Sequence, residues 1–389
     1  MRYFYCFLCC FCLGICETLK AQENFDSRAI ETGFFIGKVV KNYPVFPDRN
    51  ISNVYNVSYY KKLSGNKSWH RNYHFPEVTL QGWFGHLGNQ QILGRFYGLT
   101  GGLRYIQQLG KRWSISEQVQ FGIAYFTVQF NEQTNPENIA IGSSVTPFPN
   151  FRLSVNYNFN SNFFIAANAG IVHASNGHYK LPNLGINLPF IGVSFCYKNS
   201  LERSRIDTKE DVLLNKKIHV ATRTSLGLNE QGTSTNPVNG PKYPIYLTSL
   251  FIHKNYTPVA RWQLGFESYY NTGVYDFIIS QDYYQTKQHK KSVAALVIVG
   301  NEFLFGHVSV VTQGGVYLYN PFYKDRYKQT YNEGDTKAWL KTKVTARLGF
   351  QYYLRDAVLH PRNNFFVGWY VKTNFGQADF MECSLGYSF

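Results

Sequence analysis

Hydrophobic and polar residues alternate along several stretches of the chain, as they do in β-strands. In NFFIAANAGIVHASN, from Asn162 to Asn176, every second residue from Phe163 to Ile171 is apolar. In RWQLGFESY and KVTARLGF, the face opposite the apolar one carries charges: Arg261, Glu267, Lys343 and Arg347. Charged side chains are costly in the dry core of a β-sandwich, whereas a polar barrel lumen accepts them. The alternation therefore predicts barrel strands with an apolar outer face and a wet lumen.

The connections between these stretches are of two kinds. Short turns are expected at Leu109 to Arg112, Asn158 to Asn162, Lys254 to Pro258 and Phe305 to His307, and longer polar loops flank them, such as Gln129 to Thr146 and Tyr319 to Lys341. The chain ends in another alternating segment, MECSLGYSF, with Phe389 as its last residue. Short turns on one side and long loops on the other predict an all-β, transmembrane, antiparallel β-barrel of the outer-membrane type.

We expect about 16 strands, or about 14 if the second and third form one excursion. They are predicted to begin near residues 31, 52, 76, 95, 112, 147, 162, 187, 216, 242, 258, 289, 306, 341, 363 and 377. An even count places both ends of the chain in the periplasm. The strands divide into two sets of eight around KNSLERSRIDTKEDVLLN, and NFFIAANAGIV in the first set is similar to NFFVGWYVKTN in the second. This similarity points to an internal duplication of an eight-stranded unit. One wide barrel is favoured over two narrow ones, because only the end of the chain carries a barrel-like terminus.

The first residues have the pattern of a secretory signal. Arg2 precedes an apolar run from Tyr3 to Cys16, and a polar step then leads to Ala21. We therefore expect a signal peptide over residues 1–21, a first barrel half over 22–198, a charged connector over 199–214 and a second barrel half over 215–389. Five of the seven cysteines lie in the signal, which leaves Cys196 and Cys383 and excludes a disulfide framework.

Composition and charge narrow the class of protein further. Aromatic residues make up 17% of the chain and charged residues only 16%, with a mean hydropathy of −0.28. This mixture suits a membrane barrel, and a secreted soluble β-sandwich is the competing class. The net charge of +15 at pH 7 favours the anionic phosphates of lipopolysaccharide as partners over nucleic acid, which an exported barrel does not meet. A basic exterior without a specific ligand is the alternative. No spacing of cysteine and histidine predicts a metal site, no cofactor is expected, and His74, His178 and Lys180 are interpreted as loop residues.

A group of polar residues interrupts the apolar face of one predicted strand. His173 and Ser175 continue the face that carries Ile165 and Ile171, so both are expected to point outward, toward lipid. In the next strand, NLPFIGVSFCY, Asn187 lies on the outer face as well. Residues on the same face of paired strands lie about 5 Å apart, so these three side chains are expected to be neighbours. Two outward polar groups are costly unless they pair or serve a function, and Ser, His and Asn fit the nucleophile, base and orienter of acyl transfer.

The segment HASNGHYKLPNLGIN resembles the signature of the lipid A 3-O-deacylases, the outer-membrane acyloxyacyl hydrolase family. That family's pattern runs histidine, any residue, serine, asparagine, then a Pro-Asn-x-Gly-Ile loop and an orienting residue twelve positions after the serine. The resemblance implies a small eight-stranded barrel with its catalytic residues on the lipid-facing wall. It further implies that Ser175 is the nucleophile, His173 the general base, Asn187 the orienter, and Asn176 and Gly177 the oxyanion hole.

Two departures from the family pattern concern the site directly. The family's orienter is glutamate, whereas Asn187 can fix the histidine tautomer but carries no charge. The glycine after the Ser-Asn pair is displaced, since Gly177 follows Asn176 immediately and His178 comes next. The second half keeps Thr373 and Asn374 but lacks a His-x-Ser, so no catalysis is assigned to it.

The resemblance therefore implies an outer-membrane serine esterase of the Ser-His-Asn type, which removes an ester-linked acyl chain from lipid A. A catalytically silent barrel of the same ancestry and a passive porin are the alternatives. The porin is favoured by the wide-barrel interpretation and by the charged lumen, but it leaves the outward His173 and Ser175 unexplained. Which ester is cut, the acyl length and the oligomeric state are not indicated by the sequence.

Overall fold

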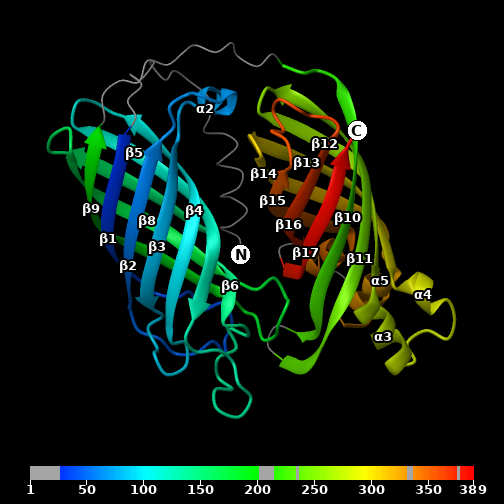
Figure 1. Ribbon diagram of the computed structural model, residues 1–389. Coiled ribbons are helices and arrows are strands. Elements are labelled where there is room, and N and C mark those ends of the chain that lie inside the picture. The colour runs from blue at the N-terminus through cyan, green and yellow to red at the C-terminus, as the bar shows by residue number, and fades with distance from the viewer. Residues whose placement is uncertain (1–26, 201–213, 234–235, 331–335, 375–376) are drawn as a thin grey trace.

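The computed structural model describes residues 27–200, 214–233, 236–330, 336–374 and 377–389. Each half of the chain closes into its own antiparallel barrel of eight strands (Figure 1). The predicted signal peptide, residues 1–21, and most of the predicted connector, residues 199–214, lie outside the described residues.

The first barrel consists of strands that pair in the order β4, β3, β2, β1, β9, β8, β7, β5, and β5 pairs with β4 to close it. A short additional strand, β6, pairs with the end of β5. Their bounds are β1 Ser27–Gly37, β2 Ser52–Lys62, β3 Glu77–His86, β4 Arg95–Gln108, β5 Trp113–Phe126, β6 Val145–Pro147, β7 Asn150–Asn158, β8 Phe163–Ala174 and β9 Ile186–Ser200.

The second barrel pairs its strands in chain order, and β17 returns to pair with β10. Their bounds are β10 Ile218–Thr233, β11 Asn236–Thr257, β12 Ala260–Asn271, β13 Val293–Phe305, β14 Val308–Tyr319, β15 Val344–Tyr353, β16 Asn364–Asn374 and β17 Gln377–Ser388.

The prediction of one wide barrel is wrong. Strand β9 pairs with β1 over its length, from Ser27 opposite Ser200 to Gly37 opposite Phe190, so the first eight barrel strands close before the second half begins. The predicted all-β antiparallel class, the count of about 16 barrel strands and their division into two sets of eight are confirmed. The physical reason for the error is that closure depends on which distant strands pair, and the alternation within a strand carries no record of that partner.

The two ends of the barrels differ only in part as predicted, because the longer connections 63–76 and 354–363 lie at the same end as the short turns. The four short turns predicted at Leu109, Asn158, Lys254 and Phe305 lie together at one end, here called the short-turn end. That end also carries a short helix, α2 (Ser68–Asn72), between β2 and β3. The opposite end, the long-loop end, carries four helices in the second barrel where only polar loops were expected: α3 Thr272–Ser280, α4 Gln288–Lys291, α5 Pro321–Thr330 and α6 Thr336–Lys343. None of the helices among the described residues is long and apolar enough to cross a bilayer.

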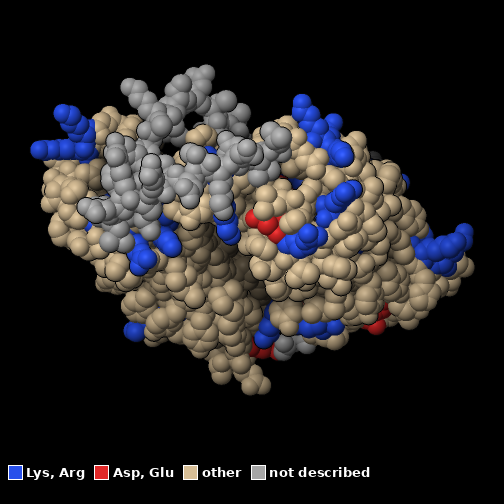
Figure 2. Space-filling model, turned by 45° about the horizontal axis from the view of Figure 1, so that its top comes forward, with Lys and Arg blue, Asp and Glu red and all other residues tan. Residues whose placement is uncertain are grey.

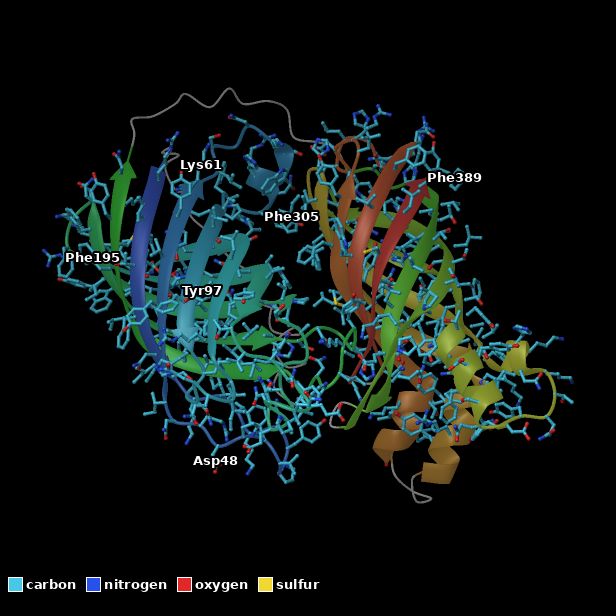
Figure 3. The ribbon with its side chains drawn as sticks, turned by 60° about the horizontal axis from the view of Figure 1, so that its bottom comes forward. Asp48, Lys61, Tyr97, Phe195, Phe305 and Phe389 are labelled. Carbon is cyan, nitrogen blue, oxygen red and sulfur yellow. The ribbon has the colours of Figure 1, made fainter. Side chains whose placement is uncertain are left out.

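The outer walls of both barrels are apolar, because the outward residue of each alternating pair is mostly aliphatic or aromatic. Exposed residues on these walls include Leu99, Ile123, Val193, Phe266 and Val299. Tyr97 and Phe195 point away from the first barrel in Figure 3. In Figure 2 the visible walls are nearly free of charge, and Lys and Arg side chains gather toward the ends. This is the surface that a hydrocarbon environment requires.

Both lumens are filled by charged and polar side chains, many of which pair with one another. In the first barrel, Glu31 lies 2.7 Å from Arg152 and 3.6 Å from Arg104. In the second, the Glu267 carboxylate contacts three cations, at 2.6 Å from Arg347, 3.0 Å from Lys372 and 3.2 Å from Arg223. An eight-stranded barrel is just wide enough for side chains to fill it. Of the two observations that favoured a passive porin, the wide barrel is absent, and the inward charges pair with one another across a narrow lumen.

The predicted lumen residues are in part correct. Arg261, Glu267 and Arg347 point inward and are buried. Lys343 does not belong to this set, because it is the last residue of α6 and β15 begins only at Val344. Cys196 is buried, Cys383 lies on the outer wall, and both are free thiols.

Candidate active site on the outer wall of the first barrel

The residues predicted to form a site lie together at the long-loop end of β8 and β9. His173 is the last outward residue of β8, and it pairs directly with Asn187 near the start of β9. The inward neighbours Val172 and Ala174 are buried in the apolar core of the barrel. The outward direction of His173, inferred from the alternation with Ile165 and Ile171, is therefore confirmed.

His173 is held at one ring nitrogen by a chain of amides. Its Nδ1 lies 2.7 Å from Oδ1 of Asn187, and Nδ2 of Asn187 donates to Oδ1 of Asn42 at 3.3 Å. Because the Asn187 amide donates to Asn42, its oxygen faces the ring, so Nδ1 of His173 carries the proton. The Nε2 atom is then the basic one, which is the tautomer that a general base needs.

Ser175 and His173 converge on the same spot next to Gly185. A Cβ atom at Gly185 would lie 3.4 Å from Cβ of Ser175 and 3.5 Å from Cε1 of His173. Gly185 has φ of +71°, and the same Cβ would meet the carbonyl oxygen of Ala174 at 2.9 Å. Only glycine fits this position without strain, so the loop can fold the serine back beside the imidazole.

Two N–H groups are directed at the Ser175 hydroxyl oxygen. Nδ2 of Asn183 donates to Oγ at 2.9 Å, and the backbone N–H of Gly177 donates to it at 3.4 Å. Asn176 is engaged elsewhere: its backbone N–H donates to Oδ1 of Asn183, and its side chain donates to Lys180 O at 2.7 Å and to Ser143 Oγ at 3.1 Å. In this structure the donors nearest to the serine are therefore Gly177 and Asn183, whereas Asn176 orders the loop.

The segment that carries the serine, residues 175–185, is here called the site loop. It rests on the apolar core of the barrel through Leu184, and Leu181 is also buried. The backbone N–H groups of Leu184 and Gly185 donate to Ile139 O and Ala140 O of the loop between β5 and β6. These contacts fix the backbone on the C-terminal side of Asn183.

Sequence reasoning missed two residues of this arrangement. Asn42 lies 145 positions before Asn187, in the loop after β1, and no local pattern connects the two. Asn183 stands in the Pro-Asn-x-Gly-Ile part of the quoted motif, so the motif contained the signal, but no role was assigned to it. His74, His178 and Lys180 lie in loops, and the described residues contain no group of three or more His, Cys, Asp and Glu side chains placed to hold a metal ion.

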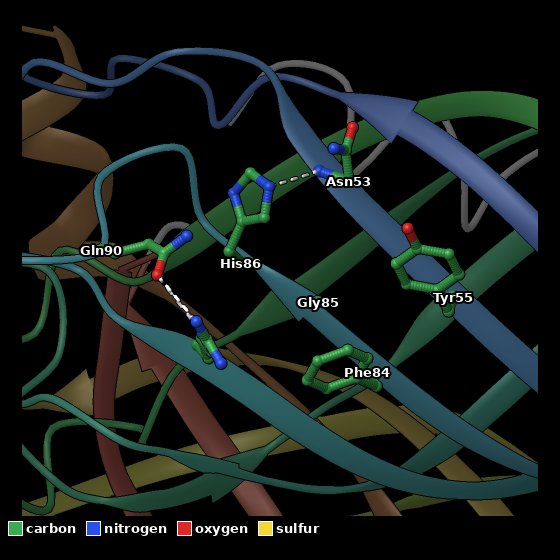
Figure 4. A pocket seen from close by; sticks show the side chains of 7 residues that line it. Asn53, Tyr55, Phe84, Gly85, His86 and Gln90 are labelled. Atoms are coloured by element: carbon green, nitrogen blue, oxygen red, sulfur yellow. Dashed lines mark hydrogen bonds between the residues drawn. The ribbon is translucent and has the colours of Figure 1, made fainter.

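A separate small pocket lies at the same end of the first barrel, on strands β2, β3 and β4 (Figure 4). Its volume is about 220 Å³, and it is lined by Asn53, Tyr55, Phe84, Gly85, His86, Gln90 and Arg95. His86 Nε2 accepts from the backbone N–H of Asn53, and Arg95 donates to Gln90. The lining side chains include no serine, threonine or cysteine, so the pocket offers no nucleophile for acyl transfer.

The second barrel has no counterpart of the site loop. Its seventh strand, β16, ends at Asn374, which pairs with Gln377 of β17. Strands β16 and β17 correspond to β8 and β9, and their bounds leave room for only a short connection, where the first barrel has the loop from Ser175 to Gly185.

Comparison with known proteins gives a match to one family. Residues 211–389 match the family model described as "Acyloxyacyl hydrolase, C-terminal domain". No curated protein matches the chain. Among solved structures, the outer membrane enzyme PagL is 14% identical, covering 43% of this chain and 97% of PagL with a TM-score of 0.29.

Two further proteins are also among the similar structures. The Pseudomonas putida toluene transporter TodX is 9% identical, covering 94% of this chain and 89% of TodX with a TM-score of 0.18. OccK11 (OpdR) of Pseudomonas aeruginosa is 10% identical, covering 96% of this chain and 99% of its own with a TM-score of 0.21. At such TM-scores these likenesses carry no argument about function. The family match covers residues 211–389, less than half of the chain, and does not include the segment 173–187. The second barrel is therefore similar to the C-terminal domain of the acyloxyacyl hydrolases, the family that the sequence resembles.

Proposed function

We propose that this protein is a serine esterase of the outer membrane that removes an ester-linked acyl chain from lipid A. In this proposal Ser175 is the nucleophile, His173 the general base and Asn187 the residue that orients it. The single observation that carries the proposal is the 2.7 Å contact between His173 Nδ1 and Asn187 Oδ1 on the outer wall of the first barrel. A paired histidine beside a serine has no packing purpose there, and burying polar groups in hydrocarbon costs free energy.

The chemistry follows from the tautomer. Nε2 of His173 takes the proton of Ser175 as Oγ attacks the ester carbonyl, and the proton then passes to the leaving alcohol. Charge develops on the carbonyl oxygen, and the N–H groups of Gly177 and Asn183 are the donors close enough to stabilise it. Water then hydrolyses the acyl-serine with the same histidine as base, which releases a fatty acid.

The location of the site fits a lipid substrate. The acyl chain of a lipid can lie along the apolar wall below His173, where Ala167 and Ala169 leave room, while its headgroup stays at the rim. Exposed basic residues near Asn187, Lys38 and Lys41, would face the phosphates of that headgroup. We place the long-loop end, which carries the site, at the cell surface, where lipopolysaccharide resides.

The test is mass spectrometry of lipid A from cells with the wild-type gene, without it, and with Ser175→Ala or His173→Ala. We expect the wild type to lose one acyl chain and each variant to leave lipid A intact, with both barrels still folded. The double variant is expected to match the single ones, since members of a triad act as a unit. Deacylation near the wild-type level in Ser175→Ala would end the serine-esterase proposal.

A further inference from the structure

The site loop is in contact with the second barrel as well as the first. Glu230, at the long-loop end of β10, donates its backbone N–H to His178 O at 3.2 Å. Its Oε2 accepts from the backbone N–H of Leu181, also at 3.2 Å. One residue of the second barrel thus holds two backbone groups of the site loop, three and six positions after Ser175.

Glu230 is itself held in place. Its side chain is buried, and Nζ of Lys242 on β11 lies 2.6 Å from Oε2. The same ammonium group lies 5.3 Å from the ring centroid of Tyr179, within cation–π range. A carboxylate that accepts from a backbone amide makes a stronger hydrogen bond than a neutral acceptor does. Glu230 and Lys242 are here called the clamp, because together they contact residues 178–181 and fix that part of the backbone.

A close contact next to the nucleophile reinforces the clamp. A Cβ atom at Gly177 would lie 2.4 Å from Cγ of Met381, on the outer wall of β17, and 3.7 Å from Cγ1 of Val371 on β16. Gly177 has φ of +61°, which also favours glycine. The loop therefore passes against the wall of the second barrel immediately after Ser175 and Asn176.

The two barrels also contact each other at the short-turn end and midway along their length. These contacts fix the position of the second barrel, and with it the position of Glu230 and Lys242. At the short-turn end, Tyr73 after α2 donates from its hydroxyl to Val259 O at 2.9 Å and stacks on Phe305, which faces the first barrel in Figure 3. Between the two ends, the rings of Phe121 on β5 and Phe350 on β15 lie 4.5 Å apart. Displacing the clamp would require the barrels to separate at these points too.

We propose that the second barrel positions the catalytic loop of the first, and that Glu230 is the positioning residue. The inference rests on the proposed function for its catalytic meaning. Glu230 touches neither the nucleophile nor the base. It sets the path of residues 178–181, and these determine where Gly177 and Asn183 present their N–H groups to Ser175. In this way the second barrel, which has no site loop, contributes to the reaction by positioning the loop of the first barrel.

The test uses the full-length protein with Glu230→Ala, Glu230→Gln and Lys242→Ala. Asp276→Ala is the matched control, because Asp276 is a carboxylate at the same end of the second barrel whose partner is the Tyr243 hydroxyl. The first readout is hydrogen exchange of the peptide that contains Leu181. We expect at least about tenfold faster exchange in Glu230→Ala, a smaller change in Lys242→Ala and none in Asp276→Ala, because only the first loses the acceptor of the Leu181 amide.

The second readout is the kinetics of deacylation. Glu230→Ala is expected to lower kcat by about 10- to 100-fold with KM within about twofold, since small displacements of catalytic groups reduce turnover without altering the lipid-binding wall. Glu230→Gln keeps an acceptor for Leu181 and is expected to restore kcat to within about threefold of the wild type.

The outcomes separate this inference from the proposed function. Unchanged exchange and unchanged kcat in folded Glu230→Ala would overturn the positioning role. A wild-type protein without deacylase activity would overturn the proposed function, and faster exchange in Glu230→Ala would then still support the clamp on the loop. If Glu230→Ala does not fold, the same measurements on Lys242→Ala test the positioning role. The Lys242 side chain is partly exposed, so its removal disturbs folding less.

Discussion

Asn187 stands where the deacylase pattern noted in the sequence has glutamate, and its replacement by alanine is the most informative change in the candidate site. The substitution removes the atom 2.7 Å from His173 Nδ1 and with it the link to Asn42. The imidazole can then rotate and exchange its tautomer, so the proposed base is no longer fixed in one orientation. The lost neutral hydrogen bond itself is worth about 1 kcal/mol of folding free energy.

The effect on turnover is expected to be larger than the effect on stability. Misplacement of a catalytic group by about 1 Å lowers rates by about 10²-fold, equivalent to about 2.7 kcal/mol of activation free energy. We therefore expect Asn187→Ala to reduce kcat by about 10²-fold or more. Asn187→Glu introduces the residue of the deacylase pattern and is expected to keep activity, because a carboxylate both orients the ring and stabilises its protonated form.

The assay is release of fatty acid from purified lipid A in mixed micelles, with a heat-modifiability gel to confirm that the barrels are folded. Thr373→Ala is the control, since Thr373 is an outward polar residue near the end of the seventh strand of the second barrel. Wild-type kcat in Asn187→Ala would refute the role of Asn187 and direct attention to another partner for His173.

Three further predictions concern the fold. An epitope inserted at Gln133 is expected to be accessible on intact cells and one at Lys111 is not, and labelling of the second site would invert the orientation. Glu267→Ala leaves Arg223, Arg347 and Lys372 without their shared carboxylate, so we expect a loss of about 3–5 kcal/mol in the free energy of unfolding, measured by urea titration; a loss below about 1 kcal/mol would contradict the buried network. Burial, together with Lys67 and Arg71, lowers the pKa of His70 in α2 to about 4 from 6.5. The unfolded chain then takes up a proton near pH 6.5 that the folded protein accepts only near pH 4, so stability is expected to fall as the pH drops through this window. In His70→Asn the urea midpoint is expected to fall less than in the wild type over this pH range. An equal pH dependence of the midpoint in both proteins would refute the role of His70.

The sequence allowed accurate prediction of features that depend on near neighbours. Strand positions followed from alternation because each side chain faces either lipid or lumen regardless of what lies far away. His173 and Asn187 could be paired because one hairpin joins them, 14 positions apart.

Features that depend on distant partners were not predictable. The pairing of β9 with β1 decides that there are two barrels, and it joins residues about as far apart as the first half is long. Glu267 meets Lys372 across 105 positions, so inward charges could be foreseen but their mutual neutralisation could not. Asn42 and Glu230 reach the site from a different loop and a different barrel, and no periodicity marks either one.

The sideways opening of the site has a kinetic consequence. Under the proposed function, a lipid substrate reaches Ser175 by diffusing within the plane of the membrane, because His173, Ser175 and Asn187 lie on an outer wall and both lumens are filled. The quantity that governs encounter is then the number of substrate molecules per unit of interface, and not their concentration in the surrounding water. Diluting lipid A with inert detergent at constant total volume would slow such an enzyme, while adding buffer at a constant lipid-to-detergent ratio would leave turnover per protein unchanged.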